Sequence, residues 1–283
     1  IIELLNLLGT GDWFRDYYLL PFSGAIWSTP KDKILDFPAH SMISFFENHA
    51  LLSRTGQHEW FTVNGGSVQY VDRLNKELFN RNVELRLGDP IKKVRRGPFG
   101  VQILSQKSEI EFFDHVVFAT HSDDTLKMLA DPSKGEATAL GAIKYQPNQA
   151  VLHHDQNVMP KNRNCWASWV YTEDKKTSLN PIGLTYWMNS LQPIPESDPM
   201  FVTLNSKNKI DPYKIYDEAT FMHPVYDLPA LNAQKDLAEN NGKKNTWFCG
   251  AWMKNGFHED GLASAIDVVA KFSDKISVKI AAQ

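Results

Sequence analysis

The chain has 283 residues, of which 42% are hydrophobic and 22% charged, and its formal net charge is −3. This composition is typical of a globular protein of about two domains, and without a long basic run it carries no electrostatic signal for nucleic-acid binding. Cys165 and Cys249 are far apart and show no CxxC spacing, which indicates a reducing compartment, and therefore a cytoplasmic location, rather than a disulfide framework.

The first 63 residues are predicted to be helical and rich in aromatic side chains. In FPAHSMISFFENHALL, Pro38 suits a first helical turn, and apolar residues recur after it at helical spacing. The opening IIELLNLLG lacks a basic segment, so it is a poor signal peptide, and no run reaches the ~18 apolar residues of a membrane helix. The chain also lacks an initiator Met, and we expect it to begin inside a larger protein.

Between residues 64 and 131 helix and strand patterns alternate. A strand-like WFTVN precedes Gly65-Gly66-Ser67, and Ser67 can cap the amphipathic helix that follows. VELRL, IKKVRR, GVQIL and EIEFF have the pattern of short strands, with GPFG as a turn. HVVFAT is a continuous apolar run typical of a buried parallel strand, after which Ser122 is expected to cap a short helix.

The rest of the chain is β-rich and aromatic before it returns to an α/β pattern. AVLHH, CWASWVY, GLTYWM and MFVTL are strand candidates, and a helix over 228–240 has Pro229 in its first turn. TWFCGAW is the last predicted strand, and the last long helix is expected over 261–272. We predict a mixed α/β fold in which a partial doubly wound layer is interleaved with a second domain of mixed β-sheet and helices. The layer comprises residues 64–131 and 242–275, the second domain residues 1–63 and 132–241, and the tail residues 276–283.

The closing strand-to-helix turn, FCGAWMKNGFHEDGLASA, has the pattern of an anion site. A buried strand ends at Gly250 and a helix is expected to open at Gly261, where unpaired amides carry partial positive charge. The two glycines would let a ligand approach the backbone closely. Alternatively, Asp260 is only the helix N-cap and His258 and Glu259 only face solvent.

Several other catalytic motifs fail on their spacing. His58 and His258, each followed by Glu, lack the second His of HExxH, and the adjacent His153 and His154 would point to opposite faces of a strand, so we expect no metal site. GGSVQ lacks the second Gly of a GxSxG elbow. No GxGxxG is present, so the sequence supplies no dinucleotide-phosphate loop of its own.

Five segments occur in a characteristic order: VNGGSVQYVDRLNKEL, DPIKKV, DHVVFATHSDDTLKMLADP, TYWMNSLQ and WFCGAWMKNGFHEDGLASA. Together they resemble the flavin-dependent amine oxidoreductase superfamily, which includes monoamine oxidases and phytoene desaturases, and most strongly a bacterial branch of predicted NAD/FAD-binding proteins. The likeness covers residues 1 to 272. It implies the C-terminal two-thirds of an FAD-dependent oxidoreductase that moves hydride from substrate C–H to flavin. The family's N-terminal GxGxxG region, which holds the FAD pyrophosphate, is missing, so we expect weak FAD binding or none, and no turnover, from the chain by itself.

The resemblance assigns cofactor contacts to several separated segments. The FAD-binding residues it implies are Gly65, Gly66, Ile91, Ala119, Thr120, Gly250, Ala251, Trp252, Asp260, Gly261 and Leu262. Ile91 would meet the adenine, while the helix that starts near Gly261 would face the flavin pyrimidine edge and stabilise the negative charge of the reduced ring. His121 and His258 are the titratable candidates for catalysis. The alternative for His121 is a purely structural role next to Ser122, the expected helix cap.

Two departures from the family pattern bear on the substrate. Gln149 stands where amine oxidases usually carry a Lys, and His258 replaces a Tyr of their aromatic cage. Both changes argue against a simple amine and favour dehydrogenation or desaturation of a larger apolar molecule. The predicted substrate pocket comprises Gln149, Trp166, Tyr186, Trp187 and Phe257. The aromatic set could equally be a packed sheet core, and because Trp166 and Trp169 are three apart, only part of it can face one pocket.

Two other function classes stay open on the sequence. The chain could be a cofactor-free module that binds an apolar ligand or a partner without turnover. A nicotinamide-dependent dehydrogenase is less well supported, because GxGxxG is absent for that cofactor too. We expect a small apolar substrate and no nucleic-acid partner. Apolar surface left exposed where a further layer should pack leads us to expect a homodimer or an adhesive patch.

Overall fold

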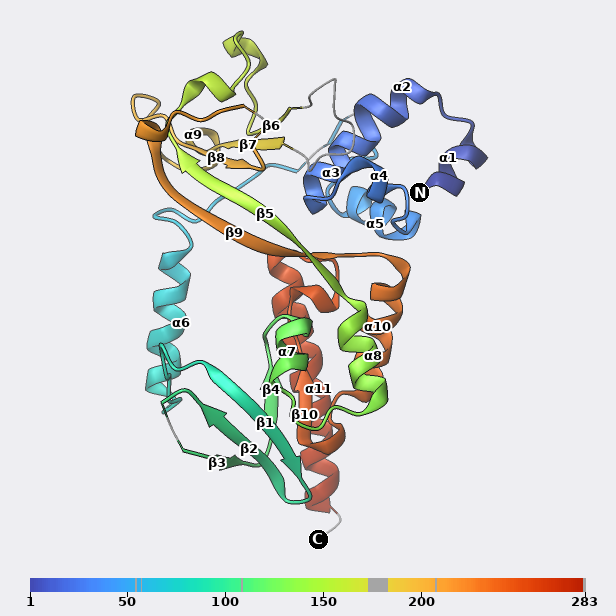
Figure 1. Ribbon diagram of the computed structural model, residues 1–283, viewed down its shortest axis with the longest axis vertical. Helices are drawn as coiled ribbons and strands as arrows, with labels where there is room; N and C mark the ends of the chain where they lie inside the picture. Colours follow the sequence, from blue (N-terminus) through green and yellow to red (C-terminus); the bar gives the residue numbers. More distant parts are fainter. Residues whose placement is uncertain (54, 57, 108, 173–182, 207, 282–283) are drawn as a thin grey trace. The chain divides into compact units, whose positions relative to one another are not determined.

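The computed structural model describes residues 1–53, 55–56, 58–107, 109–172, 183–206 and 208–281. The chain divides into two compact units, unit 1 with Ile1–Leu85 and Gln146–His223 and unit 2 with Arg86–Tyr145 and Pro224–Gln283. It passes between them three times (Figure 1), so each unit is built from two separate segments. Helices and sheets are mixed throughout, which confirms the predicted α/β class. No described helix combines the length and apolarity needed to cross a bilayer.

Unit 1 begins with a group of short helices, as the sequence predicts. They are α1 (Ile2–Leu8), α2 (Asp12–Phe14), the π-helical turn η1 (Arg15–Leu19), α3 (Leu20–Trp27), α4 (Lys31–Ile34) and α5 (Ala39–Asn48). Pro38 is the N-cap of α5, directly before the first helical residue. Trp27 packs against Phe37 with ring centroids 5.4 Å apart, and Phe22 meets Phe46 edge-on at 5.6 Å. The buried rings of Trp27, Phe37 and Phe46 therefore form part of the core of this small helical body.

A five-stranded sheet, in the order β6-β7-β8-β5-β9, completes the core of unit 1. Its strands are β5 (Lys144–His153), β6 (Trp169–Thr172), β7 (Gly183–Trp187), β8 (Phe201–Leu204) and β9 (Ile215–Val225). Short helical turns η2 (Gln156–Val158), η3 (Arg163–Cys165), α9 (Met188–Leu191) and η4 (Pro212–Lys214) connect them. Four of the strands were predicted and β9 was not, because β9 is a largely exposed edge strand without an apolar alternation. Pro224 near its end is tolerated at such an edge.

Helix α6 (Val68–Asn80) follows the Gly65-Gly66 turn at the predicted place. Ser67 occupies the N-cap position, but its side chain makes no capping hydrogen bond. The apolar stripe of α6 is exposed, and no residue of this helix is buried. The strands predicted for WFTVN and VELRL are wrong, because no described strand pairs with either segment and an unpaired segment has no ladder to join.

Unit 2 contains two small sheets. Strands β1 (Ile91–Gly97), β2 (Gly100–Ser105) and β3 (Glu111–Phe113) form an antiparallel sheet, while β4 (Val116–Phe118) and β10 (Thr246–Phe248) pair in parallel. The predicted buried parallel strand in HVVFAT is thereby confirmed. The helical segments are α7 (Ser122–Met128), α8 (Lys134–Ala142), α10 (Leu228–Asn240), η5 (Lys243–Asn245), η6 (Ala251–Met253) and α11 (His258–Ala281). The last helix thus runs through most of the expected tail, of which residues 282–283 lie outside the described residues.

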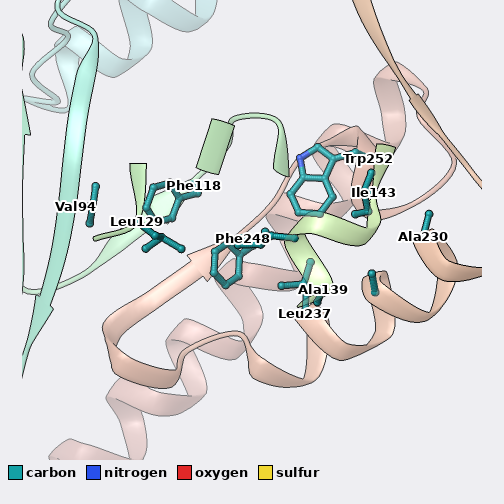
Figure 2. Close-up of a cluster of buried hydrophobic side chains, with 11 residues drawn as sticks. Val94, Phe118, Leu129, Ala139, Ile143, Ala230, Leu237, Phe248 and Trp252 are labelled. Atoms are coloured by element: carbon teal, nitrogen blue, oxygen red, sulfur yellow. The ribbon is translucent and has the colours of Figure 1, made fainter. Parts of the chain in front are cut away.

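The core of unit 2 forms around the two parallel strands. Phe118 and Phe248 are partners in the strand register, and their rings stack with centroids 5.9 Å apart. Leu140 from α8 is buried in the same cluster. Figure 2 shows Leu237 from α10 and Trp252 beside Phe248 in this cluster. Truncation of such a buried ring to Ala costs ~3–5 kcal/mol, so this contact holds together segments that are far apart in the sequence.

A buried ion network ties the antiparallel sheet of unit 2 to helix α8. The Arg96 side chain on β1 is 1% exposed, and its guanidinium donates to both oxygens of Glu136, at 2.5 and 3.0 Å, and to Asp131 Oδ2 at 3.2 Å. Glu136 also forms a capping box with Ser133 at the start of α8. Burial alone would raise the pKa of Glu136, but hydrogen bonds from Arg96 and Ser133 outweigh it and lower that pKa from 4.5 to about 2.

His153 on β5 is buried in unit 1 and held as the neutral imidazole. The Asp155 amide donates to Nδ1 at 3.1 Å, so the proton lies on Nε2, which donates to Thr203 Oγ1 at 2.7 Å. Thr203 and Thr185 hydroxyls, 3.0 Å apart, extend this chain across β8 and β7. Burial lowers the pKa of His153 to about 4, with Asp155 opposing and His154 adding to the shift.

We predict that Glu136→Gln lowers the free energy of unfolding at pH 7 by about 2 kcal/mol, because buried Arg96 then keeps only Asp131 as a charged partner. Since the folded pKa of Glu136 is depressed, its stabilisation is full above the unfolded pKa of 4.5 and is lost as the pH falls toward 2. Urea unfolding across this range should show a smaller loss for the variant, with Lys134→Gln as the matched control. An equal pH slope in variant and wild type would contradict the assignment.

We predict that His153 stays neutral in the folded protein until the pH falls well below its unfolded pKa of 6.5. Because its folded pKa is lowered, the stability that it contributes is full above pH 6.5 and declines as the pH falls toward 4. Imidazole ¹⁵N shifts recorded by NMR during a pH titration measure this directly, with His153→Asn to identify the signal. A midpoint near 6.5 would show that the ring is not buried as described.

Candidate functional site

The carboxyl ends of β4 and β10 lie side by side in unit 2. Phe118 and Phe248 are the last paired residues, so the segments that follow them leave the sheet at the same edge. In α/β proteins ligands bind outside the carboxyl ends of parallel strands. The predicted site residues that lie on these segments and at the start of α11 are Ala119, Thr120, His121, Gly250, Ala251, Trp252, Phe257, His258, Asp260, Gly261 and Leu262.

Hydrogen bonds hold these segments together. Trp252 Nε1 donates to the Thr120 carbonyl at 2.9 Å, which joins the segment after β10 to the segment after β4. The Gly250 amide donates to Ser264 Oγ at 2.8 Å, and the Ser264 hydroxyl donates to the Gly261 carbonyl at 2.8 Å. The first turns of α11 are thus attached to the end of β10 by Ser264, a residue that the sequence patterns did not single out.

Helix α11 begins three residues earlier than predicted. Its first residue is His258, and the carboxylate of Asp260, the third residue, accepts a hydrogen bond from the Phe257 amide at 2.9 Å. The prediction that Asp260 is the N-cap and Gly261 the helix start is therefore wrong, because the carboxylate reaches back to the amide that precedes the helix. A 24-residue helix still places its positive N-terminal end at this edge.

The edge is lined by small and accessible residues. Ala119, Thr120 and Leu262 are exposed. At Gly261 an added Cβ would meet nothing nearer than the Ala251 amide nitrogen, 3.9 Å away. Backbone and helix N-terminus are therefore accessible to a flat ligand. This combination suits the electron-rich edge of a flavin ring, so the residues of this edge fit that group.

The two candidate histidines lie on different segments of this edge. His121 is the exposed N-cap of α7, and its ring stacks on Tyr145 with centroids 4.5 Å apart. The prediction that Ser122 caps this helix is wrong, because Ser122 is its first residue; the Ser122 amide donates to Tyr145 Oη at 2.8 Å. His258 is exposed at the start of α11. Both imidazoles are accessible to a ligand at the edge.

Tyr226, which the sequence patterns did not single out, is buried close to this edge. Its hydroxyl has no hydrogen-bond partner among the described residues. Burial raises the pKa of Tyr226, and Tyr145 and Asp260 raise it further, so the hydroxyl stays protonated. Gly256 has a left-handed φ of +93°, and a Cβ at that position would overlap the Tyr226 hydroxyl. The loop before α11 therefore needs glycine to cover this ring.

The remaining predicted FAD-binding residues lie elsewhere. Ile91 begins β1 in unit 2 and is exposed. Gly65 and Gly66 belong to unit 1, where φ values of +81° and +80° require glycine in the turn before α6. Their contact with a cofactor stays a prediction.

The predicted pocket residues of unit 1 do not share one face of its sheet. Trp187 meets Trp166 edge-on at 5.3 Å and packs with it against the Phe201 cluster. Tyr186, the neighbour of Trp187 on β7, faces the other way and meets Trp169 at 5.4 Å. Gln149 is exposed on β5, where its amide donates to Glu218 Oε2 at 3.2 Å. The aromatic set is at least partly the sheet core that the sequence left as an alternative.

One acidic group near the edge resembles a metal site. Ligand atoms of His121, Asp123 and Asp124 lie within 4.8 Å of one another. Lys127 already pairs with both carboxylates, at 3.1 Å to Asp123 and 2.8 Å to Asp124. This arrangement is that of acidic residues in a first helical turn paired with a cation one turn later.

Comparisons with known proteins identify the fold. A family profile described as flavin containing amine oxidoreductase matches residues 10–185. Among solved structures, the fatty acid isomerase from P. acnes aligns with a TM-score of 0.61 at 16% identity, covering 95% of this chain and 65% of the isomerase. Cyclohexylamine oxidase from Brevibacterium oxydans IH-35A aligns with a TM-score of 0.61 at 10% identity, covering 98% of this chain and 67% of the oxidase. A reduced UDP-galactopyranose mutase aligns with a TM-score of 0.59 at 12% identity, covering 89% of this chain and 63% of the mutase. The chain thus spans about two thirds of these proteins, and no curated protein sequence matches it.

We predict that Gly250→Ala destabilises the protein by about 2–4 kcal/mol. Gly250 has a φ of +140°, and a Cβ there would lie 2.7 Å from Trp252 Nε1, which would weaken the bond from Trp252 to Thr120. Gly261→Ala is the matched control, because it has room for a methyl group in a helix and should change stability by no more than ~1 kcal/mol. Urea unfolding followed by tryptophan fluorescence compares the two. Equal losses would contradict the described packing of the edge.

Proposed function

Because the chain belongs to the flavin-containing amine oxidoreductase family, we propose that it is the C-terminal portion of an FAD-dependent oxidoreductase that moves hydride from a substrate C–H bond to flavin. The observation that carries this proposal is the convergence of two parallel strand ends and a helix N-terminus at one edge of unit 2. The chain spans 63–67% of the length of the three solved structures, which supports the proposal that it corresponds to a portion of such a protein.

The residues of the edge would bind and orient the cofactor, which supplies the hydride acceptor when bound. The N-terminus of α11 would stabilise negative charge on the ring by ~0.3–1 kcal/mol. Trp252 fixes the Thr120 carbonyl, and Ser264 fixes the amide of Gly250, so the backbone that meets the cofactor is held in place. His121 and His258 would hold or move a proton, since both are accessible imidazoles on the segments that form the edge.

The proposed substrate is an apolar small-molecule compound that is larger than a simple amine. Gln149, which stands where amine oxidases usually carry a Lys, hydrogen-bonds Glu218 and supplies no cation. His258 beside Phe257 departs from an aromatic amine cage. By their names, the solved structures of this fold include an oxidase of cyclohexylamine and an isomerase of fatty acids, so the fold alone does not choose between these substrate classes.

Location and assembly belong to the same proposal. The two free cysteines, Cys165 and Cys249, support a cytoplasmic location. The face of α11 that carries Leu262, Ile266 and Val269 is exposed, and an apolar stripe of this kind supports the predicted homodimer.

A cofactor-free binding module is the second candidate, and a specific observation favours it. The sequence contains no GxGxxG, so this chain by itself has no recognisable site for the FAD pyrophosphate. Such a module would bind an apolar ligand or a partner without turnover.

Titration of the purified chain with FAD and with riboflavin separates the two candidates. We predict weak binding of both, with affinities within about tenfold of each other, because the edge residues meet the ring and not the pyrophosphate. Gly261→Ala should weaken both without loss of stability, since a methyl group would stand where the ring approaches. Flavin fluorescence gives the affinities, and Ala263→Gly on the same helix is the matched control.

Each other outcome has a definite meaning. Binding of neither flavin would show that this edge does not hold the flavin ring by itself and would favour the cofactor-free module for this chain. Tight binding of FAD without riboflavin would reveal a phosphate site that the sequence did not indicate.

A further inference from the structure

The hairpin of β1 and β2 ends in an apolar apex. Its turn, between β1 and β2 in Figure 1, is Gly97-Pro98-Phe99-Gly100. Phe99 is 96% exposed. On the neighbouring strand β3, Phe112 is 74% exposed. These two rings and Phe113 line a shallow groove of about 370 Å³ beside the turn. Large aromatic side chains held in water at the end of a hairpin mark a contact surface.

The strand register places basic side chains on the same face as one of these rings. Arg95 is opposite Gln102, which is opposite Phe112, so these residues share one face of the sheet. Lys93, two residues before Arg95, lies on that face as well. The opposite face carries Val94, which belongs to the core cluster of unit 2, and Val101, which is also buried. The outward face is therefore held on a rigid support.

The charge of the β1–β2 hairpin is positive although the chain as a whole is negative. Lys92, Lys93 and Arg95 are exposed, and none of them forms an ion pair within the described parts of the chain. Asp114 is the acidic residue that lines the groove. The net charge of the whole chain is −3, so three accessible cations on one hairpin form a local excess. They are free to meet an anionic surface.

We propose that this hairpin surface, defined by Lys93, Arg95, Phe99 and Phe112, binds peripherally to an anionic lipid bilayer. Phe99 enters the boundary between headgroups and acyl chains, and the basic side chains contact lipid phosphates. Charge complementarity selects an anionic surface. The apex position of Phe99 selects a bilayer over single-stranded nucleic acid, whose bases would stack on the sheet face and leave the apex unused.

Co-sedimentation of the full chain with vesicles tests the proposal. We expect binding to phosphatidylcholine vesicles that contain phosphatidylglycerol, weaker binding at high salt, and little binding to phosphatidylcholine alone. Lys93→Gln/Arg95→Gln should weaken binding by about tenfold or more. Phe99→Ser should also weaken it severalfold, whereas Phe99→Trp should retain it, because the indole ring suits the same interface.

Matched controls lie in unit 1. Phe61→Ser removes an aromatic ring that is 86% exposed, and Arg73→Gln/Lys76→Gln removes two exposed cations from α6. Neither should change vesicle binding by more than about twofold. Urea unfolding confirms that each variant is folded.

Three results would overturn the proposal. The first is no binding to vesicles that contain phosphatidylglycerol. The second is binding that the hairpin variants leave unchanged or that the controls reduce equally. The third is binding of a single-stranded oligonucleotide, lost in the hairpin variants, without binding to vesicles, which would assign the surface to nucleic acid.

Discussion

The parallel pairing of β4 with β10 is the contact on which unit 2 and its candidate site depend. The two strands are only three residues long, and they come from segments about 130 residues apart in the chain. A ladder this short contributes little by itself, so the stacked Phe118 and Phe248 and the helices packed around them must supply most of the stability. The same register brings the residues after both strands to one edge. The geometry of the candidate site and the stability of the core therefore both depend on the pairing of β4 with β10.

Polar side chains fix the arrangement around this core. Trp252 contributes both to the core and to the candidate site. Its ring is buried in the cluster, while its Nε1 donates to the Thr120 carbonyl at the edge. Arg96 fixes the antiparallel sheet in a similar way. Its buried guanidinium must keep its carboxylate partners, Glu136 on α8 and Asp131 before that helix, so the sheet stays attached to α8. Its anchoring also holds the sheet whose outward face carries Arg95 on β1 and Phe112 on β3. Buried polar groups with a single satisfied geometry give these surfaces their rigidity.

Local sequence patterns predicted those elements that have a clear apolar run or turn and capping residues of their own. The helix over 228–240 was predicted with Pro229 in its first turn, and the strand in HVVFAT from its unbroken apolar, β-branched run. VELRL alternates like a strand but has no described partner, and β9 forms a strand although its side chains are largely exposed. Pairing decides both cases, and pairing depends on a second segment that no local window contains.

The segments of the candidate site were already indicated by the apolar runs, the glycines and the family resemblance: they are the ends of two strands and the start of a long helix. How these segments meet is a property of the tertiary structure. It showed Ser264 linking α11 to Gly250, Asp260 reaching back to the Phe257 amide, and Tyr226 buried behind Gly256. It also placed Tyr186 and Trp187 on opposite faces of one sheet. The physical reason is that hydrogen bonds and packing between distant segments depend on three-dimensional register, whereas caps, turns and apolar periods are encoded by neighbours in the chain.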